Sequence, residues 1–139
     1  MRKPIIAGAL AGLAALLGVG LWQMLPPEPE TVGGAAIVQV TVPELEGSAE
    51  IGARAFAEKC AACHGEAAGG IEGKGPPLVH KIYEPGHHGD IAFLLAARNG
   101  ARAHHWDFGD MPPVEGITEV EVAAIIAYVR TLQKANGIF

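Results

Sequence analysis

The longest apolar stretch of the chain lies close to its N-terminus. Ile5 to Leu25 contains no charged residue, and Arg2 and Lys3 precede it. At about 1.5 Å per residue, a helix over this stretch is roughly 30 Å long, the thickness of the apolar core of a bilayer. The pattern therefore predicts a membrane-spanning helix within residues 1–25. The flanking cations favour a cytoplasmic N-terminus, which places the remaining residues on the other side of the membrane.

A cleaved secretory signal is the alternative for the same residues. The apolar part of such a signal is usually only about 7–15 residues long. Here the apolar stretch runs directly into Pro26 and Pro27, with no clear small-residue cleavage site at the boundary. The length favours a retained anchor, and under both interpretations the following domain is exported.

Residues 26–47 have a different composition and predict a tether. They are rich in Pro, Gly and Glu and show no helical periodicity. Within them, residues 37–42 alternate apolar and polar side chains. This alternation fits either a short strand or an extended chain lying on the next domain.

Helical periodicity begins at Ser48, which is placed to cap a first helix that ends near residues 60–64. A short helix is predicted from Asp90 to Arg98, with Asp90 as its cap and Gly100 just after its end. Residues of the first helix recur at spacings of three and four: Ile51 with Ala55, and Phe56 with Lys59-Cys60.

The last predicted helix has the clearest boundaries. Thr118 and Glu121 have the spacing of a capping box, and Asn136 lies at the other end. Its apolar face consists of Val122, Ile125, Ile126, Val129 and Leu132. The sequence thus predicts an all-α, loop-rich domain over residues 48–139, whose own apolar core is thin for its length.

The charge of the exported part is strongly negative. All 15 acidic residues lie within residues 26–139, and so do all the basic residues except Arg2 and Lys3, which gives a net charge of −7 with histidine neutral. A nucleic-acid partner is therefore not expected. An acidic surface suits a protein partner with a basic docking patch.

The chain has two cysteines, and both belong to one motif. Residues 60–64 read Cys60-Ala61-Ala62-Cys63-His64. A C-x-x-C followed directly by His is the attachment signal for covalent c-type haem. Cys60 and Cys63 would each form a thioether with the haem, and the ring of His64 would bind the iron. The buried macrocycle would also supply the apolar contact area that the thin core lacks.

Other uses of the two cysteines are a redox dithiol, a structural disulfide and half of a zinc site. No βαβ pattern of the kind that surrounds a redox dithiol is present. A zinc site would need two further ligands, which could come from the four paired histidines His87, His88, His104 and His105.

Taken together, these residues resemble a class I c-type cytochrome over roughly residues 48–132. The haem motif matches, and so do two pairs of residues on the first and last helices: Gly52 with Phe56, and Ile125 with Tyr128. The resemblance implies a small cytochrome c fold of three to five helices around one covalent haem. It also implies that the two helices cross closely at the glycine.

The resemblance assigns further residues to the haem. Gly75-Pro76 matches a glycine–proline pair whose proline carbonyl accepts a hydrogen bond from the proximal imidazole. Met111 matches the distal methionine ligand, and Trp106 either donates its indole N–H to a haem propionate or packs against the ring. The histidine pairs have no counterpart in the family pattern.

The residues themselves leave the sixth iron ligand open between methionine and histidine. Met111 is followed by two prolines in a polar loop, where packing does not explain it, and the other methionines are Met1 and Met24. Histidine ligation would give a lower reduction potential. The candidates are His104 and His105 first, then His80, His87 and His88.

We therefore expect a one-electron carrier and not an enzyme: a membrane-tethered monohaem cytochrome c with His64/Met111 ligation. It would stand in the cell membrane with the haem domain on the periplasmic side. Its partners would be respiratory or other exported redox proteins, without nucleic acid or a small-molecule substrate. The alternative function is a copper-handling or haem-based gas-sensing module that uses the histidine pairs and an open iron site.

Overall fold

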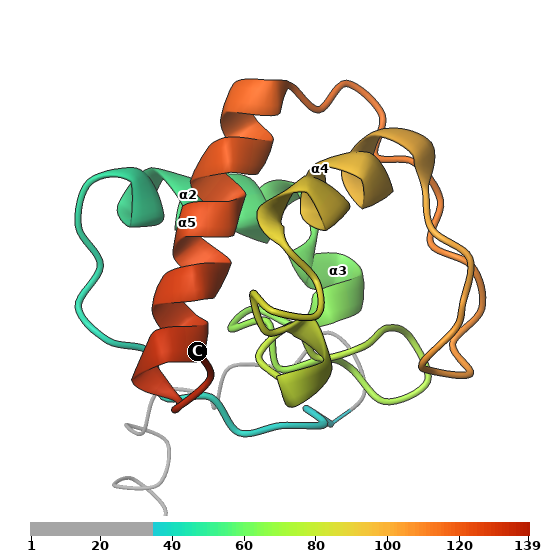
Figure 1. Cartoon of the computed structure of the whole chain (residues 1–139), viewed down its shortest axis with the longest axis horizontal. Coiled ribbons are helices and arrows are strands. Elements are labelled where there is room, and N and C mark those ends of the chain that lie inside the picture. Colours follow the sequence, from blue (N-terminus) through green and yellow to red (C-terminus); the bar gives the residue numbers. More distant parts are fainter. Residues whose placement is uncertain (1–34) are drawn as a thin grey trace, which may run out of the picture. The chain divides into compact units, whose positions relative to one another are not determined.

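The computed structural model describes residues 35–139, which form part of one compact unit. The described residues contain helices and isolated bridges but no strand, so the all-α prediction is confirmed (Figure 1). In chain order the elements are α2 (Ser48–Lys59), α3 (Ala61–His64), the 3₁₀ helix η1 (Lys81–Tyr83), α4 (Asp90–Asn99) and α5 (Glu119–Ala135).

The predicted anchor and the first part of the predicted tether, residues 1–34, lie outside the described residues. Among residues 35–139, no helix has both the length and the apolar character needed to cross a bilayer.

The centre of the domain is the crossing of α2 and α5 (Figure 1). A Cβ atom on Gly52 would lie 1.9 Å from the carbonyl oxygen of Ala124, so only glycine permits this approach. Next to the crossing, the rings of Phe56 and Tyr128 pack with their centroids 5.3 Å apart. The close helix crossing implied by the family resemblance is therefore present.

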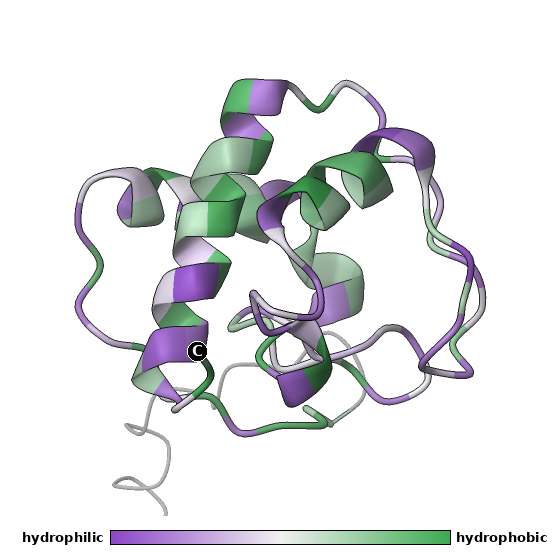
Figure 2. Cartoon of the chain, viewed as in Figure 1, coloured by the Kyte–Doolittle hydropathy of each residue, from purple (hydrophilic) through white to green (hydrophobic). Residues whose placement is uncertain are grey.

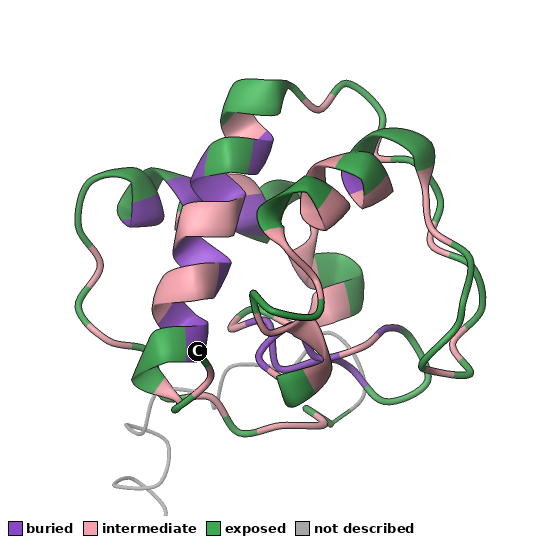
Figure 3. Cartoon of the chain, viewed as in Figure 1, coloured by how far each residue is buried: buried purple, intermediate pink, exposed green. Residues whose placement is uncertain are grey.

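The core extends from this crossing into the loop between α3 and η1. Its buried members from α2 and α5 are joined by three loop residues, Ala68, Leu78 and Val79. Figure 3 shows the buried residues concentrated on the facing sides of the two helices, and Figure 2 shows apolar and polar bands alternating along α5. The helix members are Phe56, Ile125, Tyr128, Val129 and Leu132.

The helix starts confirm one predicted cap and correct two. At α5, the Thr118 side chain accepts a hydrogen bond from the Glu121 backbone N–H, and the Glu121 carboxylate accepts one from the Thr118 backbone N–H. Ser48 and Asp90 are wrong as caps, because each is the first residue of its helix and a glycine precedes it as N-cap. The Asp90 carboxylate instead accepts a hydrogen bond from Arg130 at 2.9 Å.

The described part of the predicted tether lies along the domain. The Val38 N–H donates to the carbonyl of Gly69 at 2.9 Å, and the backbone of Thr41 exchanges two hydrogen bonds with the side chain of Asn136. Val40 and Leu45 pack against the core. Residues 37–42 therefore form no strand: the chain bends at residues 37–38 and then lies on the surface of the domain, which is closer to the second of the two structures that their alternation allowed.

We predict that Gly52→Ala lowers the free energy of unfolding by about 3 kcal/mol, because the added methyl group forces α2 and α5 apart. Denaturant unfolding of the holoprotein, followed by circular dichroism, measures the change. Gly86→Ala is the matched control. A Cβ atom there meets nothing within 4 Å, so a change within about 1 kcal/mol is expected. Equal stability of the two variants would contradict the close crossing.

Candidate functional site

The two cysteines and His64 lie on one helical turn. Cys60 is the residue between α2 and α3. Its carbonyl accepts hydrogen bonds from the N–H groups of Cys63 and His64 at 3.1 and 3.0 Å. Cys60 is half-buried, Cys63 is exposed, and both are free thiols. Burial, with a smaller contribution from Cys63, raises the pKa of the Cys60 thiol from 9.0 to about 11.

The ring of His64 is oriented by the backbone of the following loop. Its Nδ1 lies 2.9 Å from the carbonyl oxygen of Pro76, and because a carbonyl can only accept, Nδ1 carries the proton. The Nε2 lone pair is then free to bind a metal. Burial lowers the pKa of His64, and the Pro76 hydrogen bond offsets part of this effect, so the neutral imidazole is favoured.

The loop that carries Pro76 passes in close contact with the cysteine motif. A Cβ atom on Gly75 would lie 2.7 Å from the carbonyl oxygen of Cys63, so a side chain does not fit at this position. The Tyr128 hydroxyl donates to the carbonyl of Glu66 at 3.1 Å, which ties the start of the loop to α5. The Gly75-Pro76 contact that the resemblance implies is thus present.

Trp106 presents a buried polar group without a partner. Its indole Nε1 is the one buried side-chain nitrogen or oxygen of the described residues that makes no hydrogen bond. Burial raises the pKa of the Tyr83 phenol. An unsatisfied buried donor lowers stability by about 1–3 kcal/mol, so a hydrogen-bond acceptor is expected beside the indole N–H.

Met111 lies on a different loop from the cysteine motif, the one that joins α4 to α5. It pairs with Ala101 through two backbone hydrogen bonds of 3.0 and 2.8 Å, which close residues 101–111 into a loop with a narrow base. Gly100 permits this pairing, because a Cβ atom there would lie 2.5 Å from the carbonyl oxygen of Met111. Trp106 is near the middle of the same loop and packs against His80.

The structure also brings together residues whose contacts the sequence did not reveal. His87 and His88 contact His105, although the two pairs of histidines are far apart in the chain.

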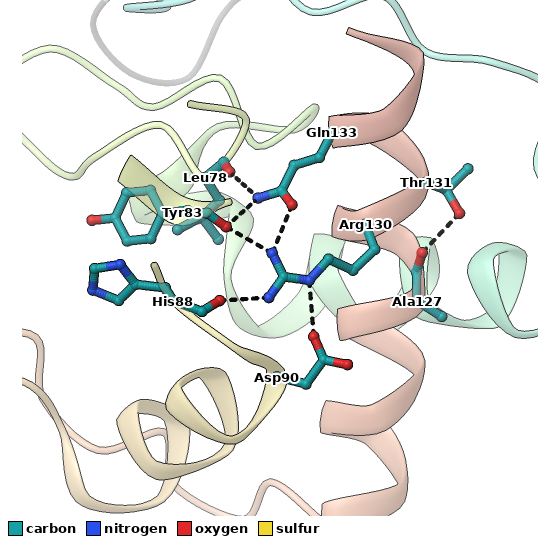
Figure 4. Close-up of polar contacts among 8 residues, drawn as sticks. All are labelled: Leu78, Tyr83, His88, Asp90, Ala127, Arg130, Thr131 and Gln133. Carbon is teal, nitrogen blue, oxygen red and sulfur yellow. Dashed lines mark hydrogen bonds and ion pairs between the residues drawn. The ribbon is translucent and has the colours of Figure 1, made fainter. Parts of the chain in front are cut away.

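Arg130 and Gln133 on α5 bind the carbonyl groups of the segment that contains η1 (Figure 4). The one signal for this network was a pair of polar residues, three apart, beside the apolar face of the last helix.

Arg130 makes contacts on every side of its guanidinium group. It donates to the carbonyl groups of Tyr83 and His88 at 2.7 and 2.6 Å, to the carboxylate of Asp90 and to the side chain of Gln133. Its guanidinium carbon also lies 4.9 Å from the centre of the Phe93 ring. Because its side chain is only 17% exposed, the contacts with the two carbonyl groups and Gln133 are partly shielded from water, whereas the Asp90 side chain is exposed.

A family model for cytochrome c matches residues 49–133, and the chain belongs to this family. No curated protein and no solved structure matches the chain. The protein therefore carries covalently bound haem c. The described residues fit this cofactor: Cys60 and Cys63 are free thiols on one turn, and His64 is held with Nε2 available.

We predict that Arg130→Lys lowers the free energy of unfolding by about 2 kcal/mol, because lysine cannot reach the same set of acceptors. Arg54→Lys is the matched control. Arg54 forms an exposed ion pair with Glu50, whose loss is expected to cost less than about 0.5 kcal/mol. Denaturant unfolding of both holoproteins measures the difference, and equal losses would contradict a structural role for Arg130.

Proposed function

We propose that the protein is a membrane-tethered monohaem cytochrome c that passes single electrons between exported redox proteins. The observation that carries this proposal is the arrangement of Cys60, Cys63 and His64 on one turn, with His64 fixed by the Pro76 carbonyl. Bound haem supplies the one-electron exchange between its two iron oxidation states.

The role of His64 in this proposal is that of a rigid ligand. A histidine that donates its other N–H to a carbonyl keeps one tautomer and one ring orientation and becomes a better donor to the metal. Since Gly75 and Pro76 lie directly on the motif, His64 has little freedom to move when the iron changes its charge. A small change in geometry between the two oxidation states favours rapid electron transfer.

Met111 is the proposed sixth ligand. Its thioether is a soft, weak donor that favours ferrous iron and raises the reduction potential above that of a bis-histidine site. The pairing with Ala101 fixes the Met111 backbone, which supports a defined position for the sulfur. If His64 and Met111 both bound the iron, a substrate would have no coordination site on it, which would suit an electron carrier and not an enzyme.

Trp106 is the proposed partner of a haem propionate. Its buried, unpaired indole N–H is a donor in need of an acceptor, and a carboxylate forms a charge-assisted hydrogen bond with such a group. Trp106 and Met111 belong to the same closed loop, so this loop would hold both the propionate and the iron.

The charge of the chain supports a protein partner. The net charge of −7 on residues 26–139 favours a partner whose docking patch is basic. The apolar stretch Ile5 to Leu25 supports the proposed anchor, with the haem domain on the periplasmic side.

We predict that Met111→Ala abolishes the methionine-to-iron charge-transfer band of the oxidised protein and lets the reduced protein bind carbon monoxide. Met111→His is expected to keep the iron low-spin and to lower the potential by on the order of 0.1 V or more. His104→Gln and His105→Gln serve as controls, because these histidines are the rival ligands. Loss of the charge-transfer band in either control, or its absence from the unaltered protein, would contradict the assignment of Met111 as the sixth ligand.

We predict that protein extracted from membranes has the mass of the full 139-residue chain, 14.4 kDa, plus one haem. Replacing residues 1–25 with a cleavable secretory signal should move the haem protein to the soluble periplasmic fraction. Subcellular fractionation and intact mass spectrometry measure both outcomes. A shortened N-terminus in the unaltered protein would show that the segment is a signal and not an anchor.

A further inference from the structure

Three histidines from two separate segments converge at the surface. His87 and His88 lie between η1 and α4, and His105 lies in the loop between α4 and α5. One ring nitrogen from each of the three can be chosen so that all lie within 4.8 Å of one another. His87 and His105 are closest, with their Nε2 atoms 3.3 Å apart.

The separation of these two nitrogens matches that of two ligands on one metal ion. Two nitrogens at about 2.0–2.1 Å from a tetrahedral zinc ion are roughly 3.3 Å apart. His87 and His105 already have this separation. Since both residues are exposed, the small rotations needed to bring in the third ring meet little resistance.

His88 is held in the way that metal-binding histidines usually are. Its Nδ1 donates to the carbonyl of Ile82 at 2.7 Å, which leaves Nε2 unprotonated in the neutral ring. The His88 carbonyl in turn accepts a hydrogen bond from Arg130, so its backbone is tied to α5 (Figure 4). One ligand is thus fixed before any metal binds.

Hydrogen bonding among the rings does not account for the cluster. A single proton shared between His87 and His105 satisfies one nitrogen of each, but the structure gives the Nε2 atom of His88 no such partner.

We propose that His87, His88 and His105 bind one divalent transition-metal ion of the zinc, copper and nickel class. Imidazole nitrogen suits these ions, whereas magnesium and calcium prefer oxygen ligands. Water would complete the coordination. His104 contacts the cluster through its ring, but it is not among the residues whose ligand atoms all lie within 4.8 Å of one another.

A bound ion would join two parts of the domain that lie far apart in sequence. One ligand, His105, is on the loop of residues 101–111, next to Trp106, and the other two precede α4. The ion would therefore restrain the same loop that holds Met111. The site requires that none of these three histidines is the sixth ligand of the haem iron, and in this respect it rests on the proposed Met111 ligation.

Zinc titration of the tag-free holoprotein tests the proposal. Zinc does not change oxidation state, so it cannot exchange electrons with the haem, and in the holoprotein the cysteines are not free to bind it. We expect calorimetry to show one zinc ion per chain with a dissociation constant on the order of micromolar, and no binding of magnesium. No saturable zinc binding up to about 1 mM would overturn the proposal.

Single substitutions identify the ligands. His87→Gln, His88→Gln and His105→Gln should each weaken zinc binding by about 100-fold or more, because even removing a residue that only orients a ligand costs about 10–100-fold. His104→Gln is the matched control and should change the affinity less than about tenfold. Unchanged binding in His105→Gln, or an equal loss in His104→Gln, would overturn the assignment of these three residues. An unaltered visible spectrum confirms that each variant has kept its haem site.

Discussion

The contact on which the rest of the domain depends is the approach of Gly52 to the backbone of Ala124. It lets α2 and α5 cross without an intervening side chain and brings Phe56 against Tyr128. Because α2 leads directly into the cysteine motif, the crossing also fixes where the haem is attached relative to α5. A wider crossing would separate the attachment site from the polar side chains that α5 supplies.

Those polar side chains hold the irregular part of the chain in place. Between α3 and α4 the backbone has little regular structure, so its carbonyl groups need donors from elsewhere. Tyr128, Arg130 and Gln133 supply them from one stretch of α5. Figure 4 shows the contacts of Arg130 and Gln133. Through these hydrogen bonds, α5 fixes the loop that follows the cysteine motif and the segment that leads to the histidine cluster.

Features set by local sequence could be predicted, and features set by contacts between distant segments could not. The three main helices, the capping box at Thr118 and the cysteine motif each depend on residues a few positions apart. The hydrogen bond between His64 and Pro76 could be predicted from the family resemblance, but not from any local pattern. The contact of His87 with His105 depends on how loops fold over one another, and so do the contacts of Arg130. No periodicity in the sequence indicates these contacts. The two wrong caps are an exception among the local features, since Ser48 and Asp90 have suitable side chains but each follows its N-cap by one residue.

The hydrogen bonds between Thr41 and Asn136 have a consequence for how the domain comes apart. They join residues 95 positions apart, at the beginning and the end of the described chain, by a donor and an acceptor on each side. Displacement of either segment breaks both bonds, although Val38 is also bound to Gly69 and Val40 packs on the core. Truncation before Asn136 would thus loosen the chain around Thr41, which should lose part of its protection from hydrogen exchange together with the end of α5.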